Sequence, residues 1–222
     1  MTIAAKELIS LMRILLTILC SGLAVLVYGQ AADYPDYRNK KESFLKVSDK
    51  PLRADLASFT TAGIEESIGK LPLRKISPTG YDRVQMKFKS NEVEVTITTA
   101  AFEAGNRKLL KSGENLVKIN NKPFYGSYGQ VPNTMISGIT VLIGKDTVAI
   151  PPAAYADLFN LNFTYRDKSN VERTANAVYF SADGKRMYIY LLSRDRNGSY
   201  EVTWVIEGKT FLRRVLDWGF TQ

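Results

Sequence analysis

Carboxylates are the main side chains that this chain offers for catalysis. Its 222 residues include no histidine, and the single cysteine, Cys20, lies close to the N-terminus. This composition excludes Ser-His-Asp and Cys-His nucleophilic systems, and it removes the imidazole and thiolate ligands of the usual zinc and copper sites. A glycosidase, however, needs only two carboxyl groups, separated by about 5–5.5 Å or 6.5–9.5 Å. A glycan hydrolase that uses carboxylates alone is therefore the enzyme class left open.

The pattern of the acidic residues favours structural roles over catalysis. Asp183 precedes Gly184 in an expected turn, and Glu201 is expected to face Arg194 across a hairpin. The chain contains no GxGxxG, P-loop or HExxH motif. We therefore predict no catalytic residue, no metal site and no cofactor, and we favour a non-enzymatic function.

Residues 1–29 have the pattern of a cleaved secretory signal peptide. Two basic residues precede the apolar run 14–27, which is shorter than the roughly 20 residues of a membrane-spanning helix. A small residue, Gly29, follows shortly after the run, and we expect cleavage after Gly29 or Ala31. After cleavage no transmembrane anchor remains. The alternative is an uncleaved signal anchor.

The expected mature chain is basic and has no cysteine. The whole chain carries 30 Lys and Arg against 22 Asp and Glu, a formal net charge of +8. An exported chain of this length without disulfides fits the bacterial periplasm, the cell surface or a secreted location. A basic surface is compatible with anionic partners such as lipid headgroups, acidic glycans or nucleic acid. The favoured alternative is a solvated surface that is merely basic, because the chain has no block of five or six like charges. Export and the lack of a recognisable motif argue against nucleic acid as the partner.

Four β-strands are expected near the C-terminal end, because tight-turn dipeptides separate four apolar runs. Asp-Gly and Asn-Gly supply the positive φ angles of two-residue hairpin turns. The strands are 178–181, 186–193, 200–206 and 210–215, and their turns are Asp183-Gly184, Asn197-Gly198 and Gly208-Lys209. Strand 186–193 is apolar on both faces, so we expect it in the middle of a sheet with other elements packed on each side.

Two-residue loops fix an expected register for each hairpin. With Asn197-Gly198 as the loop, Trp204 faces Leu191; with Gly208-Lys209, Ile206 faces Phe211 and Val205 faces Leu212. Because successive side chains of a strand point to opposite faces of the sheet, every second residue of each strand is expected to face the core and the others the opposite face.

Further hairpins are expected before this meander. Alternating residues in 81–100 turn at Ser90-Asn91, which places Phe88 opposite Val93. Two more hairpins turn at Asn120-Asn121 and around Lys145-Asp146, and Pro152 begins a short helix at 152–159.

The expected organisation is a signal peptide at 1–29, an extended lead-in at 30–52 and a single β-rich domain at 53–222. The lead-in contains a possible short edge strand around Phe44, with a flexible linker as the alternative. The fold class is mainly β: antiparallel hairpins form a β-sandwich or a strongly bent sheet.

Three aromatic residues are the candidate ligand-binding residues: Tyr125, Tyr128 and Trp218. The first two lie in a Gly/Tyr-rich loop, where exposed aromatic rings on an adaptable backbone are typical of a binding surface. The alternative is that these rings pack onto the sheet.

The favoured function is that of an exported, non-enzymatic β-domain that binds a protein or glycan partner through loops at one end of the sheet. One alternative is the carboxylate-only glycan hydrolase. The other is a scaffold subunit that joins its partners by β-strand addition.

Overall fold

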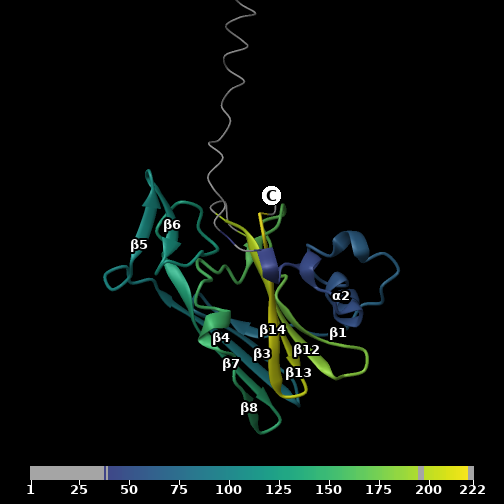
Figure 1. Ribbon diagram of the computed structural model, residues 1–222. Helices are drawn as coiled ribbons and strands as arrows, with labels where there is room; N and C mark the ends of the chain where they lie inside the picture. The colour runs from purple at the N-terminus through teal and green to yellow at the C-terminus, as the bar shows by residue number, and fades with distance from the viewer. Residues whose placement is uncertain (1–37, 39, 195–197, 220–222) are drawn as a thin grey trace, which may run out of the picture. The chain divides into compact units, whose positions relative to one another are not determined.

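The computed structural model describes residues 38, 40–194 and 198–219 (Figure 1). The expected signal peptide and the first part of the lead-in lie outside these residues. The described chain is mainly β, with antiparallel strands, as the sequence predicts. The strands are β1 Arg74–Ile76, β2 Pro78–Tyr81, β3 Gln85–Lys89, β4 Val93–Ala101, β5 Leu109–Ser112, β6 Asn115–Ile119, β7 Thr134–Ile143, β8 Asp146–Val148, β9 Tyr165–Arg166, β10 Glu172–Arg173, β11 Ala177–Phe180, β12 Arg186–Ser193, β13 Tyr200–Glu207 and β14 Thr210–Trp218.

Helices occupy little of the described chain. The α-helix α2 (Lys50–Ala57) is capped by Asp49, whose side chain accepts a hydrogen bond from the backbone N–H of Leu52, and it has a proline in its first turn. Four 3₁₀ helices complete the set: η1 Lys40–Glu42, η2 Phe44–Lys46, η3 Ile64–Glu66 and η4 Pro152–Ala154. The short helix expected at 152–159 is thus a single 3₁₀ turn, and the α-helix lies earlier in the chain.

Two five-stranded sheets form a β-sandwich. The meander sheet has the order β1-β11-β12-β13-β14, and the hairpin sheet has the order β2-β3-β4-β7-β8. Side chains from both sheets meet in one buried core, where Phe88 and Ile97 of the hairpin sheet lie in the same cluster as Ile189 and Trp204 of the meander sheet. Trp204 is fully buried, and its indole N–H donates to the carbonyl of Ala154 at 2.9 Å, which satisfies its polar atom.

The other face of the meander sheet is also buried. A second apolar cluster joins Tyr188 and Val205 of this sheet to Phe44, Leu52 and Leu56 of the preceding helical segment. This confirms that strand β12 is covered on both faces. Residues 40–57 form η1, η2 and α2 where the sequence suggested an edge strand or a linker, and the lead-in boundary expected at residue 52 falls inside α2.

A buried carboxylate fastens this helical cover to the sheet. Glu201 on β13 is 2% exposed and accepts hydrogen bonds from the backbone N–H groups of Thr61 (2.8 Å) and Ala62 (2.7 Å) and from the Tyr190 hydroxyl (2.7 Å). The expected pairing of Glu201 with Arg194 is wrong, because Glu201 stands opposite Leu192. Three donors compensate the burial of this charge, so it acts as a structural anchor.

Two hairpins have longer loops than expected. Trp204 faces Ile189 instead of Leu191, and Phe88 faces Val95 instead of Val93. In the second case the Ser90 hydroxyl accepts from the N–H of Val93, which supports a wider turn. Each register differs by two residues, so every side chain keeps its expected face. Part of the Asn197-Gly198 turn lies outside the described residues.

A β-bulge changes the alternation on β14. Ile206 faces Phe211 as expected, but Val205 faces Arg213, so Leu212 is an extra residue without a partner. Beyond the bulge the alternation is reversed, and Arg214 and Trp218 join the inner face of the meander sheet. A sequence pattern that assumes strict alternation places both residues on the opposite side.

We predict that Glu201→Ala destabilises the protein by about 3 kcal/mol, because it leaves two buried N–H groups and a tyrosine hydroxyl without their acceptor. Urea unfolding followed by tryptophan fluorescence measures the loss. The control is Glu94→Ala, which removes only a surface ion pair with Lys89 and costs less than about 1 kcal/mol. Equal losses in the two variants would contradict an anchoring role for Glu201.

Candidate functional site

The three aromatic residues predicted for binding lie together near the C-terminal end of β14. The Trp218 and Tyr125 rings pack with centroids 5.1 Å apart. The guanidinium carbon of Arg38 lies 4.7 Å from the Tyr128 ring centroid and 5.3 Å from that of Trp218, and the Lys40 ammonium lies 5.4 Å from Trp218. We call these five residues the aromatic–cation cluster.

The cluster has a buried base and an exposed rim. Tyr125 is 4% exposed, whereas Tyr128 is 42% exposed and Trp218 is half-buried. Burial, reinforced by the negative charge of Asp157, raises the pKa of Tyr125 to about 12, so this phenol stays neutral at physiological pH. The buried Tyr125 ring thus packs against Trp218 on its side toward the protein interior, and Tyr128 presents its ring to solvent.

The loop that carries the tyrosines is held firmly. Gly126 has φ +92°, and a Cβ at this position would lie 1.9 Å from the Phe159 carbonyl oxygen, so another residue does not fit. The side-chain amide of Asn160 donates to the Gly126 carbonyl, and its oxygen accepts from the N–H of Asn133 at 2.9 Å. The backbone N–H of Tyr125 donates to the carbonyl of Asp157. This fixed backbone sets the position of both tyrosines.

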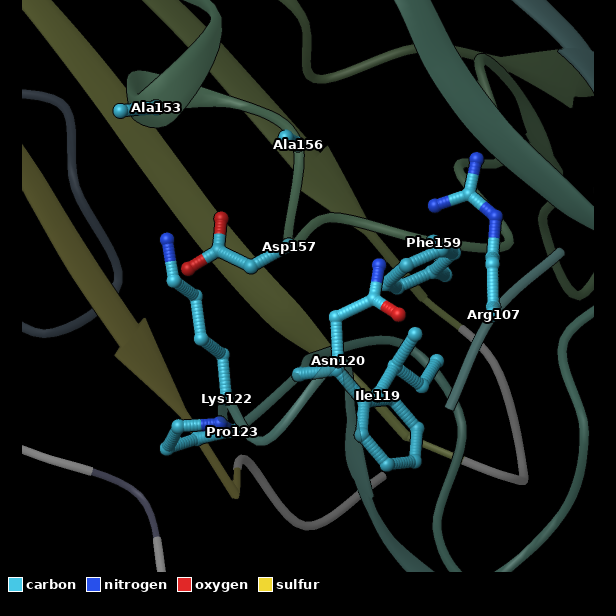
Figure 2. Close-up of a pocket in the computed structure, with 10 residues that line it drawn as sticks. Arg107, Ile119, Asn120, Lys122, Pro123, Ala153, Ala156, Asp157 and Phe159 are labelled. Atoms are coloured by element: carbon cyan, nitrogen blue, oxygen red, sulfur yellow. The ribbon is translucent and has the colours of Figure 1, made fainter. Parts of the chain in front are cut away.

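A small cavity of 170 Å³ lies beside this loop (Figure 2). Its wall is mostly apolar, and two cations, Arg107 and Lys122, and the carboxylate of Asp157 also line it. Asp157 connects the cavity to the cluster, because its backbone bonds Tyr125 and its side chain bonds Arg214. The remaining lining residues are Ile119, Asn120, Pro123, Phe124, Ala153, Ala156 and Phe159.

Arg214 is the buried charge at the centre of this end of the sandwich. Its guanidinium donates to Glu42 at 2.9 Å, to Asp157 at 3.0 Å and to the carbonyl of Ala154. Burial alone lowers the pKa of an arginine, but the hydrogen bonds and charges of Asp157 and Glu42 outweigh it and raise the pKa of Arg214. Asp157 is thereby committed to an ion pair, which argues against its use as a catalytic base.

One pair of carboxylates lies on adjacent strands under the helical cover. Glu201 and Asp217 face each other on β13 and β14. Burial, together with the charge of Glu201, raises the pKa of Asp217 to about 6, although the hydrogen bond from the N–H of Phe44 opposes the shift. Neither carboxylate lines a described cavity. Both serve to hold residues 40–62 on the sheet.

A second pair of acids lines a polar cavity of 310 Å³. Asp82 accepts hydrogen bonds from the N–H groups of Val84 and Gln85, and Glu172 accepts one from the Thr164 hydroxyl. Both acids are exposed to solvent, whereas the general acid of a glycosidase typically lies in an apolar, partly buried environment. This pair lacks the setting that a carboxylate-only hydrolase needs.

Metal-site geometry is not found within the described ranges, where no three acidic side chains gather as an ion would need. Among the same residues, no helix is both long and apolar enough to cross a bilayer. No protein-family model, curated protein or solved structure matches the chain. The function is therefore argued from the geometry alone.

Sequence reasoning found the three aromatic residues of the cluster but missed its cations. Arg38 and Lys40 lie in the stretch expected to be an extended lead-in, more than 80 residues before Tyr125. Nothing local in the sequence connects them to Trp218, because the contact depends on how residues 40–57 fold back over the meander sheet.

We predict that the stability of the protein falls as the pH rises from about 4 to 7, through Asp217. Its folded pKa is raised above the ordinary value of 3.8, so the folded state binds the proton more tightly and this contribution is lost as the pH passes about 6. In Asp217→Asn the penalty is absent. The variant should gain about 1–2 kcal/mol relative to wild type between pH 4.5 and pH 7.5 in urea unfolding. A difference that does not change with pH would contradict this role.

Proposed function

We propose that this protein is an exported, non-enzymatic β-domain that binds an acidic glycan through the aromatic–cation cluster at one end of the sandwich. The observation that carries the proposal is the position of Arg38, whose guanidinium lies over both Tyr128 and Trp218. The export part of the proposal rests on the signal-peptide pattern of residues 1–29.

The chemistry of the cluster favours a negatively charged partner. Tyr125, Arg38 and Lys40 all pack against the ring of Trp218, so the cluster offers charged groups more than free aromatic faces. Cation–π contacts hold the two cationic groups near each other, which lowers the entropy cost of binding. A guanidinium recognises carboxylate and sulfate groups through paired hydrogen bonds.

The surroundings of the carboxylates support binding without catalysis. Glu201 is saturated by three donors, Asp157 is paired with Arg214, and Asp82 and Glu172 are exposed. Each of these four acids thus has a structural role or an ordinary surface setting. A partner bound at the cluster would meet cations first.

Strand addition finds less support in the sheet edges. The edge strands β1, β2 and β8 have three or four residues each. The longest edge strand, β14, is interrupted by the bulge at Leu212. Short or bulged edges are devices that discourage pairing with another chain.

We predict that Arg38→Gln with Lys40→Gln weakens binding to polygalacturonate or dextran sulfate by about tenfold or more at physiological salt. Calorimetry on the chain from Gln30 onward, the expected mature form, measures the affinity. Tyr128→Ala should also weaken binding, because it removes one of the two aromatic rings that position the guanidinium of Arg38. Neutral dextran should not bind.

The matched control is Lys87→Gln with Lys145→Gln, which removes the same charge from other exposed positions. An equal loss in this control would show that only net charge matters and would contradict a site at the cluster. Tighter binding to polyglutamate than to either acidic glycan would replace the glycan with an acidic protein segment as the partner.

A further inference from the structure

Three large aliphatic side chains point into solvent on the loop between α2 and β1. Ile64 is 64% exposed, Ile68 is 89% exposed and Leu71 is 84% exposed. Single exposed aliphatic residues are common on protein surfaces. Three within eight residues of one loop make a concentrated apolar surface, which is typical of an interaction site.

The exposure of these side chains is built into an ordered loop. Successive turns are closed by backbone hydrogen bonds from Glu66 to Gly63, from Ser67 to Ile64 and from Lys70 to Ser67. A Cβ on Gly63 would lie 2.6 Å from the Cα of Ala57, so the glycine allows the loop to lie tightly against the end of α2.

Two charged contacts fix the loop to the rest of the molecule. The carboxylate of Glu201 receives the N–H groups of Thr61 and Ala62 at its beginning, and Arg53 on α2 forms an ion pair with Glu66. Because the loop already holds its aliphatic side chains outward, binding a partner carries little additional entropy cost for ordering its backbone.

Cationic side chains accompany the aliphatic ones. Lys70, Arg74 and Lys75 are exposed, and the last two lie against aromatic rings at the base of the loop, Arg74 with its guanidinium carbon 3.9 Å from the Phe180 centroid. Residues 64–75 carry three cations against two acids, the exposed Glu65 and Glu66, and Glu66 is paired with Arg53. The net charge of this segment is therefore positive.

We infer that this loop docks on the surface of an anionic lipid bilayer. Ile64, Ile68 and Leu71 enter the boundary between headgroups and acyl chains, while Lys70 and Lys75 contact the anionic headgroups. Apolar burial plus attraction of nearby cations is the combination that holds peripheral proteins on membranes.

A bilayer fits this loop better than a protein groove for two reasons. Protein interfaces are usually anchored by aromatic or arginine side chains in pockets, whereas the exposed tip of this loop carries only aliphatic anchors. In addition, neither of the two described cavities is lined by residues of this loop. The surface shares no residue with the aromatic–cation cluster, and the inference stands or falls separately from the proposed function.

The test is sedimentation of the chain from Gln30 onward with vesicles of phosphatidylcholine alone or with 30% phosphatidylglycerol. This form keeps every described residue and lacks the apolar run 14–27, which would bind lipid by itself. We expect binding to the anionic vesicles and much weaker binding to the neutral ones. No binding to anionic vesicles would overturn the inference.

The Ile68→Ser, Leu71→Ser double variant distinguishes membrane binding by the apolar side chains of the loop from binding by the net positive charge of the protein. Its folding should be unchanged because both side chains are exposed, and its partition onto anionic vesicles should fall by about tenfold or more. The matched control is Val131→Ser with Leu212→Ser, two exposed aliphatic residues elsewhere, which should bind as wild type does. A loss in the control equal to that in the loop variant would overturn the inference.

Two further variants report on insertion and on charge. In Ile68→Trp, the new fluorophore should shift to shorter wavelength when anionic vesicles are added, and an unchanged spectrum would overturn the insertion of this side chain. Lys70→Gln with Lys75→Gln should lose most of the preference for anionic over neutral vesicles, while Lys87→Gln with Lys145→Gln should keep it. The opposite pattern would place the lipid contact elsewhere on the molecule.

Discussion

The buried carboxylate of Glu201 is the interaction on which the outer half of this structure depends. The meander sheet is apolar on both faces, so its outer face needs a cover as much as its inner face does. Residues 40–62 supply that cover, and Glu201 receives two of their backbone N–H groups while it also binds Tyr190. Without this anchor, the aliphatic loop would lose its support.

Much of the fold follows from local rules. Turn dipeptides and two-residue alternation locate the strands of the meander sheet, and the double-sided apolar pattern of β12 places it in the interior. The register was harder to predict, because the loop length decides it. Since the errors at Trp204 and Phe88 were each of two residues, the faces, and with them the core, were still correct.

The features that sequence reasoning missed all depend on distant parts of the chain. The bulge at Leu212 is visible only when Val205 and Arg213 are seen to pair, and it decides that Arg214 and Trp218 lie on the inner face. The aromatic residues of the candidate site stood out by their type. Arg38 could not be recognised in this way, because its role depends on Tyr128 and Trp218, which lie far from it in the sequence and beside it in the fold.

The helical cover joins nearly opposite ends of the chain. Phe44 bonds Asp217 across 173 positions, and Glu42 bonds Arg214 across 172. During synthesis from the N-terminus, Phe44 and its neighbours therefore lack their partners until β14 has been made. Contacts between residues so far apart in the chain form slowly. Until they form, the apolar side chains of the helical cover and of the outer sheet face stay exposed and prone to aggregation.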